Sequence, residues 1–368
     1  MAPVPSGSHL RRRVGKLAAA LTSEGLAGAV VVPGPNMTYY TGVRAHLFER
    51  PFLMFVKGDG EVVLLAPKLE AGVFRDSVPM TVRAWEDTEG PSRAFDEVVG
   101  SLGKGEWGCE GRAPYGYLGH LLKRGVRLVP GDRVLESVRV VKEASELQLL
   151  RRSAQMLAKT ILKVPEVLRD GVSEREVARF IAEDARAGGA DEVDPMVQSG
   201  PRAADPHSET STRRIGRGES VVIDVVSFHG GYAADITRTF VLGAGGPVER
   251  TYGSVVSAQR KAIAKARAGA TTGSVDAAAR TSLEMDGLGR YFIHRTGHGL
   301  GLEVHEAPYI VPGGNERLAP GMVFTVEPGA YIPSKLGVRI EDDVAVSKDG
   351  TCETLTGAVP TDYGWWAR

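Results

Sequence analysis

Four acidic residues stand inside apolar, strand-like segments of the C-terminal half of the chain, and this feature limits the possible folds more than any other. They are Asp224 in "VVIDVVSF", Asp235 in "YAADITRTF", Glu327 in "VFTVEPGAY" and Glu341 in "GVRIEDDVAV". A carboxylate buried alone is strongly unfavourable, so buried carboxylates are normally paired or bound to a metal. The fold must therefore bring these segments together around compensating positive charge.

The first two acids are separated by a turn signal. Asp224 ends an apolar run, and Asp235 follows eleven residues later, with "HGG" between them. A strand, a glycine turn and a returning strand would bring both carboxylates to the same sheet face. Glu327 is expected inside a hydrophobic strand, and Glu341 on one face of another strand.

Two histidines lie seven residues apart in "TGHGLGLEVHEAP", residues 296–308. A solvated loop does not need the apolar residues of this segment, and a core strand does not favour two imidazoles. The four carboxylates and His298 are most simply explained by a shared pair of divalent cations. Oxygen ligands with one imidazole and no thiolate suit Mn, Co, Fe or Zn rather than a structural zinc site.

Each of these residues also has an ordinary structural interpretation. An aspartate at a strand end is usually a turn or cap residue, and a single histidine is more often a hydrogen-bonded structural group. The metal hypothesis rests on all five occurring in one domain, each in an apolar or glycine-rich segment. Two ions about 3.5–4 Å apart would hold a hydroxide and polarise a carbonyl, which is metal-assisted hydrolysis.

Length and composition set further limits. With 368 residues the chain is too long for one ordinary core, so two domains are expected. Lys plus Arg equals Asp plus Glu at 45 each, so no net field favours nucleic acid or an anionic membrane. No apolar run approaches the roughly 18 residues that suggest a membrane span.

The cysteines and the N-terminus favour a reducing compartment. Only Cys109 and Cys352 occur, far apart in sequence, so a disulfide framework is not indicated. Arginines at residues 11–13 precede an apolar stretch, but Lys16 and "TSEG" interrupt the core that a signal peptide requires. We therefore expect a cytoplasmic protein.

Residues 10–135 have the pattern of a small α/β domain, preceded by an unstructured tail over residues 1–9. Apolar residues recur at helical spacing from Leu10 to Leu21, and "GAVVVPG" then predicts a buried strand. "FLMFV" and "EVVLLAP" flank "KGDG", which predicts a β-hairpin. Further strands are expected at "WGCEG" and "VRLVPG", so the sheet should be mostly parallel or mixed, with helices on it.

The pattern changes near residues 136–142, where a long amphipathic helix is predicted to open a second domain over residues 136–368. One stripe of that helix is apolar, with charges opposite, and its members are Leu147, Leu150, Ala154, Leu157 and Ile161. The second half of this domain is strand-like and rich in glycine.

The motifs occur in the order found in a known family. "DVVSFHGGYAADITRTF", "GHGLGLEVHEAP", "VFTVEPGAYIP" and "GVRIEDDVAV" resemble the pita-bread metallopeptidases, in the branch of aminopeptidase P and prolidase. "NMTYYTG" and "RVVKEASELQLLRRSA" extend the resemblance over nearly the whole chain. It implies an α/β (α+β) protein, with a creatinase-like N-terminal α/β domain and a C-terminal pita-bread catalytic domain.

The resemblance also implies a role for each metal ligand. Asp224 would chelate the first metal, and Asp235 and Glu341 would bridge both. His298 and Glu327 would complete the second metal. Two divalent ions per chain are expected, Mn first, with Co or Zn as alternatives.

Further roles follow from the same resemblance. His305 would hydrogen-bond the scissile carbonyl, and His207, in "SGPRAADPHSET", would shape the substrate pocket. Arg339 would orient the carboxylates, and Glu327 would carry a proton to the leaving nitrogen. The family usually has glycine two residues after the first ligand, where this chain has Val226, which could affect metal preference.

The expected reaction is hydrolysis of the Xaa-Pro bond, preferentially in dipeptides, with aminopeptidase P activity on longer peptides as the alternative. A dipeptidase must bind the proline carboxylate, a task suited to arginine. Arg44 and Arg50, in "TGVRAHLFERP", are the predicted carboxylate-binding residues, and solvated loop charges are the alternative. Arg317 is less clearly in register. The resemblance also implies a homodimer.

Three other classes are less consistent with the sequence. Methionine aminopeptidases share the five ligands but usually lack an N-terminal domain of this kind. Creatinase shares the two domains but has lost the ligands that stand here. Non-enzymatic binding proteins of this fold tend to lose ligands or gain basic extensions, and this chain does neither.

Overall fold

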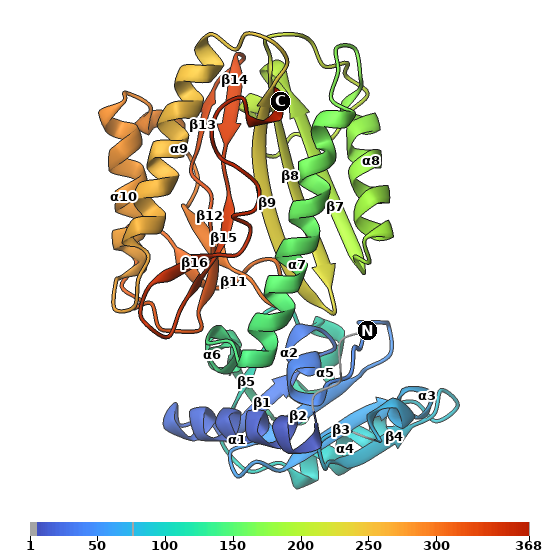
Figure 1. Cartoon of the computed structure of the whole chain (residues 1–368). Coiled ribbons are helices and arrows are strands. Elements are labelled where there is room, and N and C mark those ends of the chain that lie inside the picture. Colours follow the sequence, from blue (N-terminus) through green and yellow to red (C-terminus); the bar gives the residue numbers. More distant parts are fainter. Residues whose placement is uncertain (1–5, 76, 368) are drawn as a thin grey trace. The chain divides into compact units, whose positions relative to one another are not determined.

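The computed structural model describes residues 6–75 and 77–367. The chain divides into two compact units, which separate between Arg139 and Val140 (Figure 1). The boundary predicted between residues 135 and 136 falls within helix α6 (Asp132–Val140). Of the predicted tail, residues 1–5 lie outside the described part of the chain, whereas residues 7–9 already belong to helix α1 (Gly7–Ser23).

The N-terminal unit contains one mixed sheet of six strands in the order β4-β3-β2-β1-β5-β6. The strands are β1 (Gly28–Val31), β2 (Leu53–Lys57), β3 (Val62–Pro67), β4 (Thr81–Trp85), β5 (Glu106–Cys109) and β6 (Arg127–Pro130). β2 pairs antiparallel with β1 and with β3, and the remaining pairs are parallel. The hairpin expected around "KGDG" is the β2–β3 pair.

Among residues 6–75 and 77–140, six α-helices accompany this sheet. Besides α1 and α6 they are α2 (Pro35–Thr41), α3 (Lys68–Ala71), α4 (Ser92–Ser101) and α5 (Tyr115–Leu122). Helix α2 begins with a proline, which suits the first helical position, and ends at Gly42 in the left-handed conformation. The alternation of strands and helices matches the α/β pattern of the sequence.

The C-terminal unit has three sheets. β7 (Glu192–Ser199), β8 (Ser220–His229) and β9 (Tyr232–Val241) form an antiparallel sheet of three strands. A second sheet has the order β11-β10-β12-β15-β16, and β13 pairs with β14. These strands are β10 (Gly297–Gly299), β11 (Glu306–Ile310), β12 (Val323–Val326), β13 (Gly329–Ile332), β14 (Leu336–Arg339), β15 (Asp342–Val346) and β16 (Cys352–Thr354).

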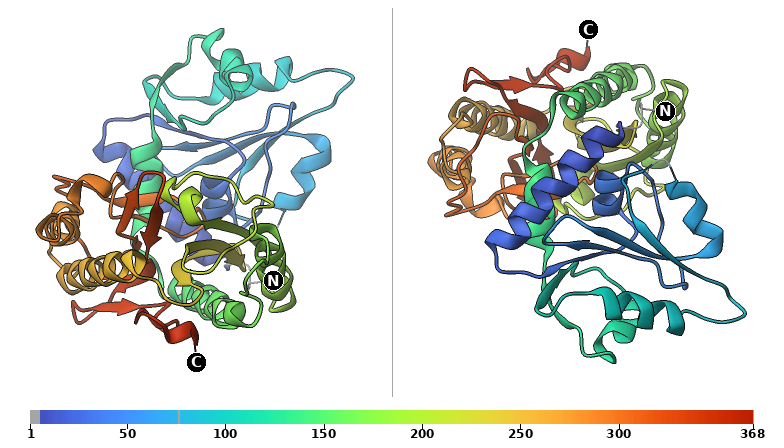
Figure 2. Two further views of the ribbon diagram at one scale, coloured as in Figure 1. Left: turned by 90° about the horizontal axis from the view of Figure 1, so that it is seen from above. Right: turned by 90° about the horizontal axis from the view of Figure 1, so that it is seen from below.

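Helices pack against these sheets in two groups. α7 (Ala144–Lys163) and α8 (Glu174–Ala187) pack on the three-stranded sheet. α9 (Pro247–Lys265) and α10 (Thr272–Met285) lie side by side and pack near β14 and β11 (Figures 1 and 2). Within the described residues, no helix has the length and apolar character needed to cross a membrane.

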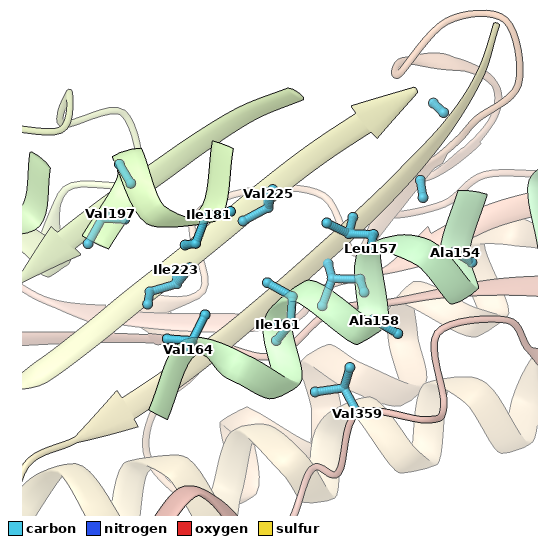
Figure 3. Packing of buried hydrophobic residues seen from close by; sticks show 14 of the residues in the cluster. Ala154, Leu157, Ala158, Ile161, Val164, Ile181, Val197, Ile223, Val225 and Val359 are labelled. Atoms are coloured by element: carbon cyan, nitrogen blue, oxygen red, sulfur yellow. The ribbon is translucent and has the colours of Figure 1, made fainter. Parts of the chain in front are cut away.

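The predicted apolar stripe of α7 forms much of one core. Leu157 and Ile161 are fully buried, and they share this core with Ile223 and Val225 of β8 (Figure 3). Leu150 and Ala154 are buried too, and the remaining stripe residue packs partly buried against the same cluster. This core fixes the outer face of β8, so the opposite face of the hairpin is available for the carboxylates.

Candidate metal centre and active site

The β8–β9 hairpin carries the first two acids. In its register Asp224 lies opposite Thr237, and Val226 lies opposite Asp235. Since side chains alternate along a strand, Asp224 and Asp235 project from the same face. The turn holds Gly230 and its neighbour glycine, with φ of 59° and 83°, which only glycine adopts freely. Asp224 lies in the middle of β8 rather than at its end.

The sequence predicts that Glu327 and Glu341 lie within strands, and this prediction is wrong. Glu327 falls in the break between β12 and β13, and Glu341 in the break between β14 and β15. The backbone N–H of each glutamate therefore forms its hydrogen bond outside the ladder of the strands that flank it. That of Glu327 donates to Thr296 O at 2.8 Å, and that of Glu341 donates to Thr237 O at 3.0 Å. The second bond ties the break carrying Glu341 directly to the hairpin.

These elements bring four of the five predicted ligands together. Ligand atoms of Asp235, His298 and Glu341 all lie within 4.8 Å of one another. His298 Nε2 lies 3.4 Å from Glu327 Oε1 and 3.9 Å from Asp235 Oδ2. The predicted ligands from β9, β10 and the two strand breaks thus share one buried site, which we call the acidic cluster.

Asp224 joins the acidic cluster through Arg339. The Nη2 of Arg339 lies 2.6 Å from Asp224 Oδ2, and its Nε donates to Thr237 Oγ1 at 3.1 Å. Thr237 Oγ1 in turn donates to Glu341 Oε2 at 2.6 Å. Arg339 therefore contacts Asp224 directly and reaches Glu341 through Thr237, and the orienting role that the resemblance implied stays a prediction.

The pKa shifts of the acidic cluster indicate that its negative charge exceeds the positive charge beside it. Burial raises the pKa of Asp235 and of Glu341 well above the usual range, and neighbouring carboxylates raise both further. Burial also raises the pKa of Glu327 to about 7, against the lowering effect of Arg339. One oxygen each of Asp224 and Asp235 is buried without a hydrogen-bond partner. A divalent cation would satisfy both needs, so the donor set fits a metal.

The two histidines differ in exposure. Burial, followed by the neighbouring His305, lowers the pKa of His298 to about 3, so its imidazole is neutral, as a metal ligand must be. Its Nδ1 lies 3.2 Å from Gly299 O, which favours a proton there and leaves Nε2 free to face the carboxylates. His305 is exposed, with its ring 4.1 Å from that of His298.

His207 lies outside these contacts. It is exposed in the loop before β8, and among the described residues no hydrogen bond or ion pair joins its side chain to the acidic cluster. The buried Gln198 holds this loop by donating to Pro206 O at 3.2 Å and to Ser208 O at 2.7 Å. The substrate role of His207 stays a prediction.

Arg44 and Arg50 belong to the N-terminal unit. Arg44 is exposed in the loop after α2. The Nε and Nη2 of Arg50 donate to the two carboxylate oxygens of Asp87 at 2.9 and 2.8 Å. A carboxylate of the substrate would have to displace Asp87 from Arg50. Their role in substrate binding also stays a prediction.

The sequence interpretation missed two groups that touch the acidic cluster. His294 Nδ1 lies 3.9 Å from Glu327 Oε2, and its Nε2 lies 3.0 Å from Tyr331 Oη. Arg339 donates to the same Tyr331 oxygen at 2.7 Å. The spacing of four residues between His294 and His298 was a usable signal, whereas Tyr331 read as an ordinary strand residue.

Comparison with known proteins agrees with this geometry. The model of "Metallopeptidase family M24" matches residues 148–348, and that of the "Creatinase/Prolidase N-terminal domain" matches residues 13–141. The chain belongs to metallopeptidase family M24. The predicted creatinase-like domain and pita-bread catalytic domain are confirmed, and the chain is a metal-dependent peptidase.

Its relatives align along almost their full length. The peptidase is 39% identical over 346 residues to "Probable dipeptidase PepE" of Mycobacterium tuberculosis, covering 92% of each chain. It is 31% identical over 347 residues to the "Xaa-Pro dipeptidase" of Pyrococcus horikoshii, covering 93% of this chain and 96% of the other.

Solved structures are similar too. Dipeptidase PepE from Mycobacterium ulcerans superposes with a TM-score of 0.91 at 36% identity, covering 98% of this chain and 99% of that one. A recombinant prolidase from Thermococcus sibiricus gives a TM-score of 0.89 at 36% identity, with 96% and 97% covered. The two-domain architecture is therefore shared from end to end.

Proposed function

We propose that this peptidase hydrolyses the Xaa-Pro bond of dipeptides, and that aminopeptidase P activity on longer peptides is the second candidate. The observation that carries the proposal is the acidic cluster, with the buried His298 inside it and the exposed His305 at its edge. Relatives named dipeptidase, Xaa-Pro dipeptidase and prolidase cover nearly the whole chain, which supports the dipeptide class.

We propose two divalent ions as the metal content, Mn first, with Co or Zn as alternatives. Asp224 would hold one ion, His298 and Glu327 the other, and Asp235 and Glu341 would contact both. The excess of buried carboxylates over positive groups and the two unpaired carboxylate oxygens support this number. When bound, the ions would polarise the scissile carbonyl and lower the pKa of a water molecule.

The remaining steps fall to side chains of this chain. Burial lowers the pKa of His305, so the imidazole is neutral and can donate its N–H to the carbonyl oxygen as negative charge develops there. Glu327 would pass a proton to the proline nitrogen as the bond breaks. Arg339 would keep Asp224 and Thr237 aligned throughout.

The cellular setting is part of the same proposal. We propose a cytoplasmic location, which is supported by the two cysteines, both of them free thiols. We also propose a homodimer, which is supported by the resemblance to the family. Light scattering of the purified protein tests the dimer. A mass near twice 39.2 kDa is expected, and a monomer at micromolar concentration would contradict it.

A peptide panel with added Mn, Co or Zn tests the activity. We expect about two ions per chain and faster cleavage of Xaa-Pro than of Xaa-Pro-Yaa. Equal rates on the tripeptides would identify an aminopeptidase P. A chain that binds no metal and cleaves neither substrate would be a non-enzymatic binding protein, the remaining class that the sequence left open.

A further inference from the structure

Arg295 lies in sequence between two histidines of the active site, His294 and His298. It follows His294 directly and stands three residues before His298. The backbone carbonyl of Arg295 accepts a hydrogen bond from His294 Nδ1 at 2.7 Å. Its side chain is only partly buried, so the guanidinium remains accessible to a ligand.

The guanidinium of Arg295 stacks on the ring of Tyr309, which lies across the ladder from His298. Its central carbon lies 4.9 Å from the centre of the Tyr309 ring, a cation–π contact. Tyr309 of β11 lies directly opposite His298 of β10 in the ladder. Cross-strand partners share a sheet face, so the stacked arginine is on the face from which His298 projects.

Arg295 also differs from the other arginines around the site in having no acidic partner. Arg339 is paired with Asp224, and Arg280 of α10 is paired with Asp276 at 2.9 Å. Among the described residues, no ion pair joins the Arg295 guanidinium to a carboxylate, and the guanidinium contacts the Tyr309 ring. Once cations compensate the acidic cluster, Arg295 is left as an unmatched positive charge.

We propose that Arg295, stacked on Tyr309 beside His298, binds the C-terminal carboxylate of a dipeptide substrate. This inference rests on the proposed dipeptidase function and names the residue that selects dipeptides. A guanidinium presents two parallel N–H groups to a carboxylate, and stacking on a ring fixes its plane without using those donors.

Two other arginines considered for this task, Arg50 and Arg317, already donate hydrogen bonds within the protein. The Nε and Nη2 of Arg50 donate to Asp87. Arg317 is exposed, and its Nη1 donates to Gly269 O at 2.9 Å.

The test measures binding separately from hydrolysis. A dipeptide analogue in which the scissile carbonyl is reduced to methylene is titrated calorimetrically into the metal-loaded protein, as the free acid and as the C-terminal amide. The wild type is expected to bind the acid about 10-fold to 100-fold more tightly, the range of a charge-assisted contact. Arg295→Met should lose this preference and bind the amide as the wild type does.

Arg290→Met is the matched control. Arg290 is an exposed arginine of the same segment, and its guanidinium also stacks on a tyrosine, 4.7 Å from the Tyr291 ring centre. This variant should keep the full preference for the acid. Arg295→Gln is the second neutral variant, for use if the methionine variant does not fold.

Equal binding of acid and amide by the wild type would overturn the inference, and so would a preserved preference in the neutral Arg295 variants. Kinetics provide a second measurement, in which KM for Xaa-Pro should rise about 10-fold to 100-fold while kcat changes little, because binding outside the reacting bond is lost. If the wild type cleaves no Xaa-Pro dipeptide, the proposed function fails. The calorimetric comparison still decides the role of Arg295 in that case.

Discussion

Two buried polar clusters of the catalytic unit stand next to each other in sequence but differ in charge balance. In the first, which we call the arginine cluster, the fully buried Arg238 lies 2.8 Å from Asp342. Gln259 and Thr356 donate to the same carboxylate at 2.6 Å each. The other donors of Arg238 reach backbone carbonyls of Thr237, Glu341, Val359 and Pro360. This cluster is satisfied by the protein alone.

The acidic cluster is the opposite case. Four carboxylates face one arginine, Arg339, and the neutral His298. Buried oxygens of Asp224 and Asp235 have no partner, although Asp235 is only three residues from Arg238. Burial of charged groups therefore serves two purposes. A balanced buried cluster holds the fold together, whereas an unbalanced one is completed by a ligand.

The largest effect is expected for Glu341→Ala. Removing a carboxylate that would contact both ions should abolish metal binding and lower activity by more than about 10⁴-fold, because the remaining acids repel one another without cations. Metal analysis and Xaa-Pro hydrolysis measure the two effects. Glu353→Ala, at a partly exposed glutamate paired with Arg151, is the control and should retain both. Full activity with two metals retained would contradict the ligand assignment.

Arg238→Met tests the arginine cluster and should act on folding instead. Leaving Asp342 buried without its partner should cost about 3–5 kcal/mol of the free energy of unfolding, measured with urea. Folded molecules should still bind metal. The double variant Arg238→Met with Asp342→Leu removes both charges and should recover much of the stability. No recovery in the double variant would mean that the carbonyl bonds of Arg238, and not charge balance, carry the effect.

Next in size is His305→Ala. This histidine is exposed and is not needed to compensate buried charge. We expect both metals to stay bound while kcat falls by about 10²–10³-fold, the loss that follows removal of one donor to a developing oxyanion. Loss of metal in this variant would make His305 a ligand and reverse the roles of the two histidines.

The sequence could predict the members of the acidic cluster, but not the difference between the two clusters. The segment "IEDDVAV" places Glu341, Asp342 and Asp343 together, and its sequence does not distinguish a metal ligand from a structural acid. The distinction depends on partners far away in sequence. Asp342 meets Arg238, while Asp343 Oδ2 accepts the backbone N–H of Asp235 at 3.0 Å.

The fold was predictable where periodicity is local. The α7 stripe and the β2–β3 hairpin follow from spacing and turn residues within one segment. The breaks at Glu327 and Glu341 were missed because apolar residues resume within a few positions, although Pro328 and Gly329 follow the first glutamate and Asp342 and Asp343 follow the second. Proline and aspartate are disfavoured inside strands, so each break had a local signal. The bonds to Thr296 and Thr237 show where each backbone leaves its ladder.

Removing the metal should make the stability of the protein depend on pH, because the excess negative charge of the acidic cluster is then uncompensated. In the metal-free protein burial raises the pKa of Glu327 from its usual 4.5 to about 7. The folded state then holds this proton more tightly than the unfolded state, so stability is expected to fall as pH rises from about 4.5 to about 7, by about 3 kcal/mol. Thermal unfolding with a chelator measures the trend. Glu327→Gln should flatten it, and a stability that rises over this window would contradict it.

The smallest effect is expected for the exposed pair Arg50–Asp87 of the N-terminal unit. Solvent can hydrate either of these charges if its partner is removed, whereas the charges of the two buried clusters depend on partners in the protein. Surface ion pairs contribute little to stability, so Arg50→Met should leave the melting temperature nearly unchanged. Because Asp87 already accepts hydrogen bonds from the Nε and Nη2 of Arg50, we also expect KM for Xaa-Pro dipeptides to stay within about twofold of the wild type, well below a tenfold change. Asp87→Asn sharpens the test, since it weakens the hold on Arg50 without removing the arginine. A rise in KM with Arg50→Met, and none with Arg295→Met, would transfer the selection of dipeptides to the N-terminal unit, as the sequence had first suggested.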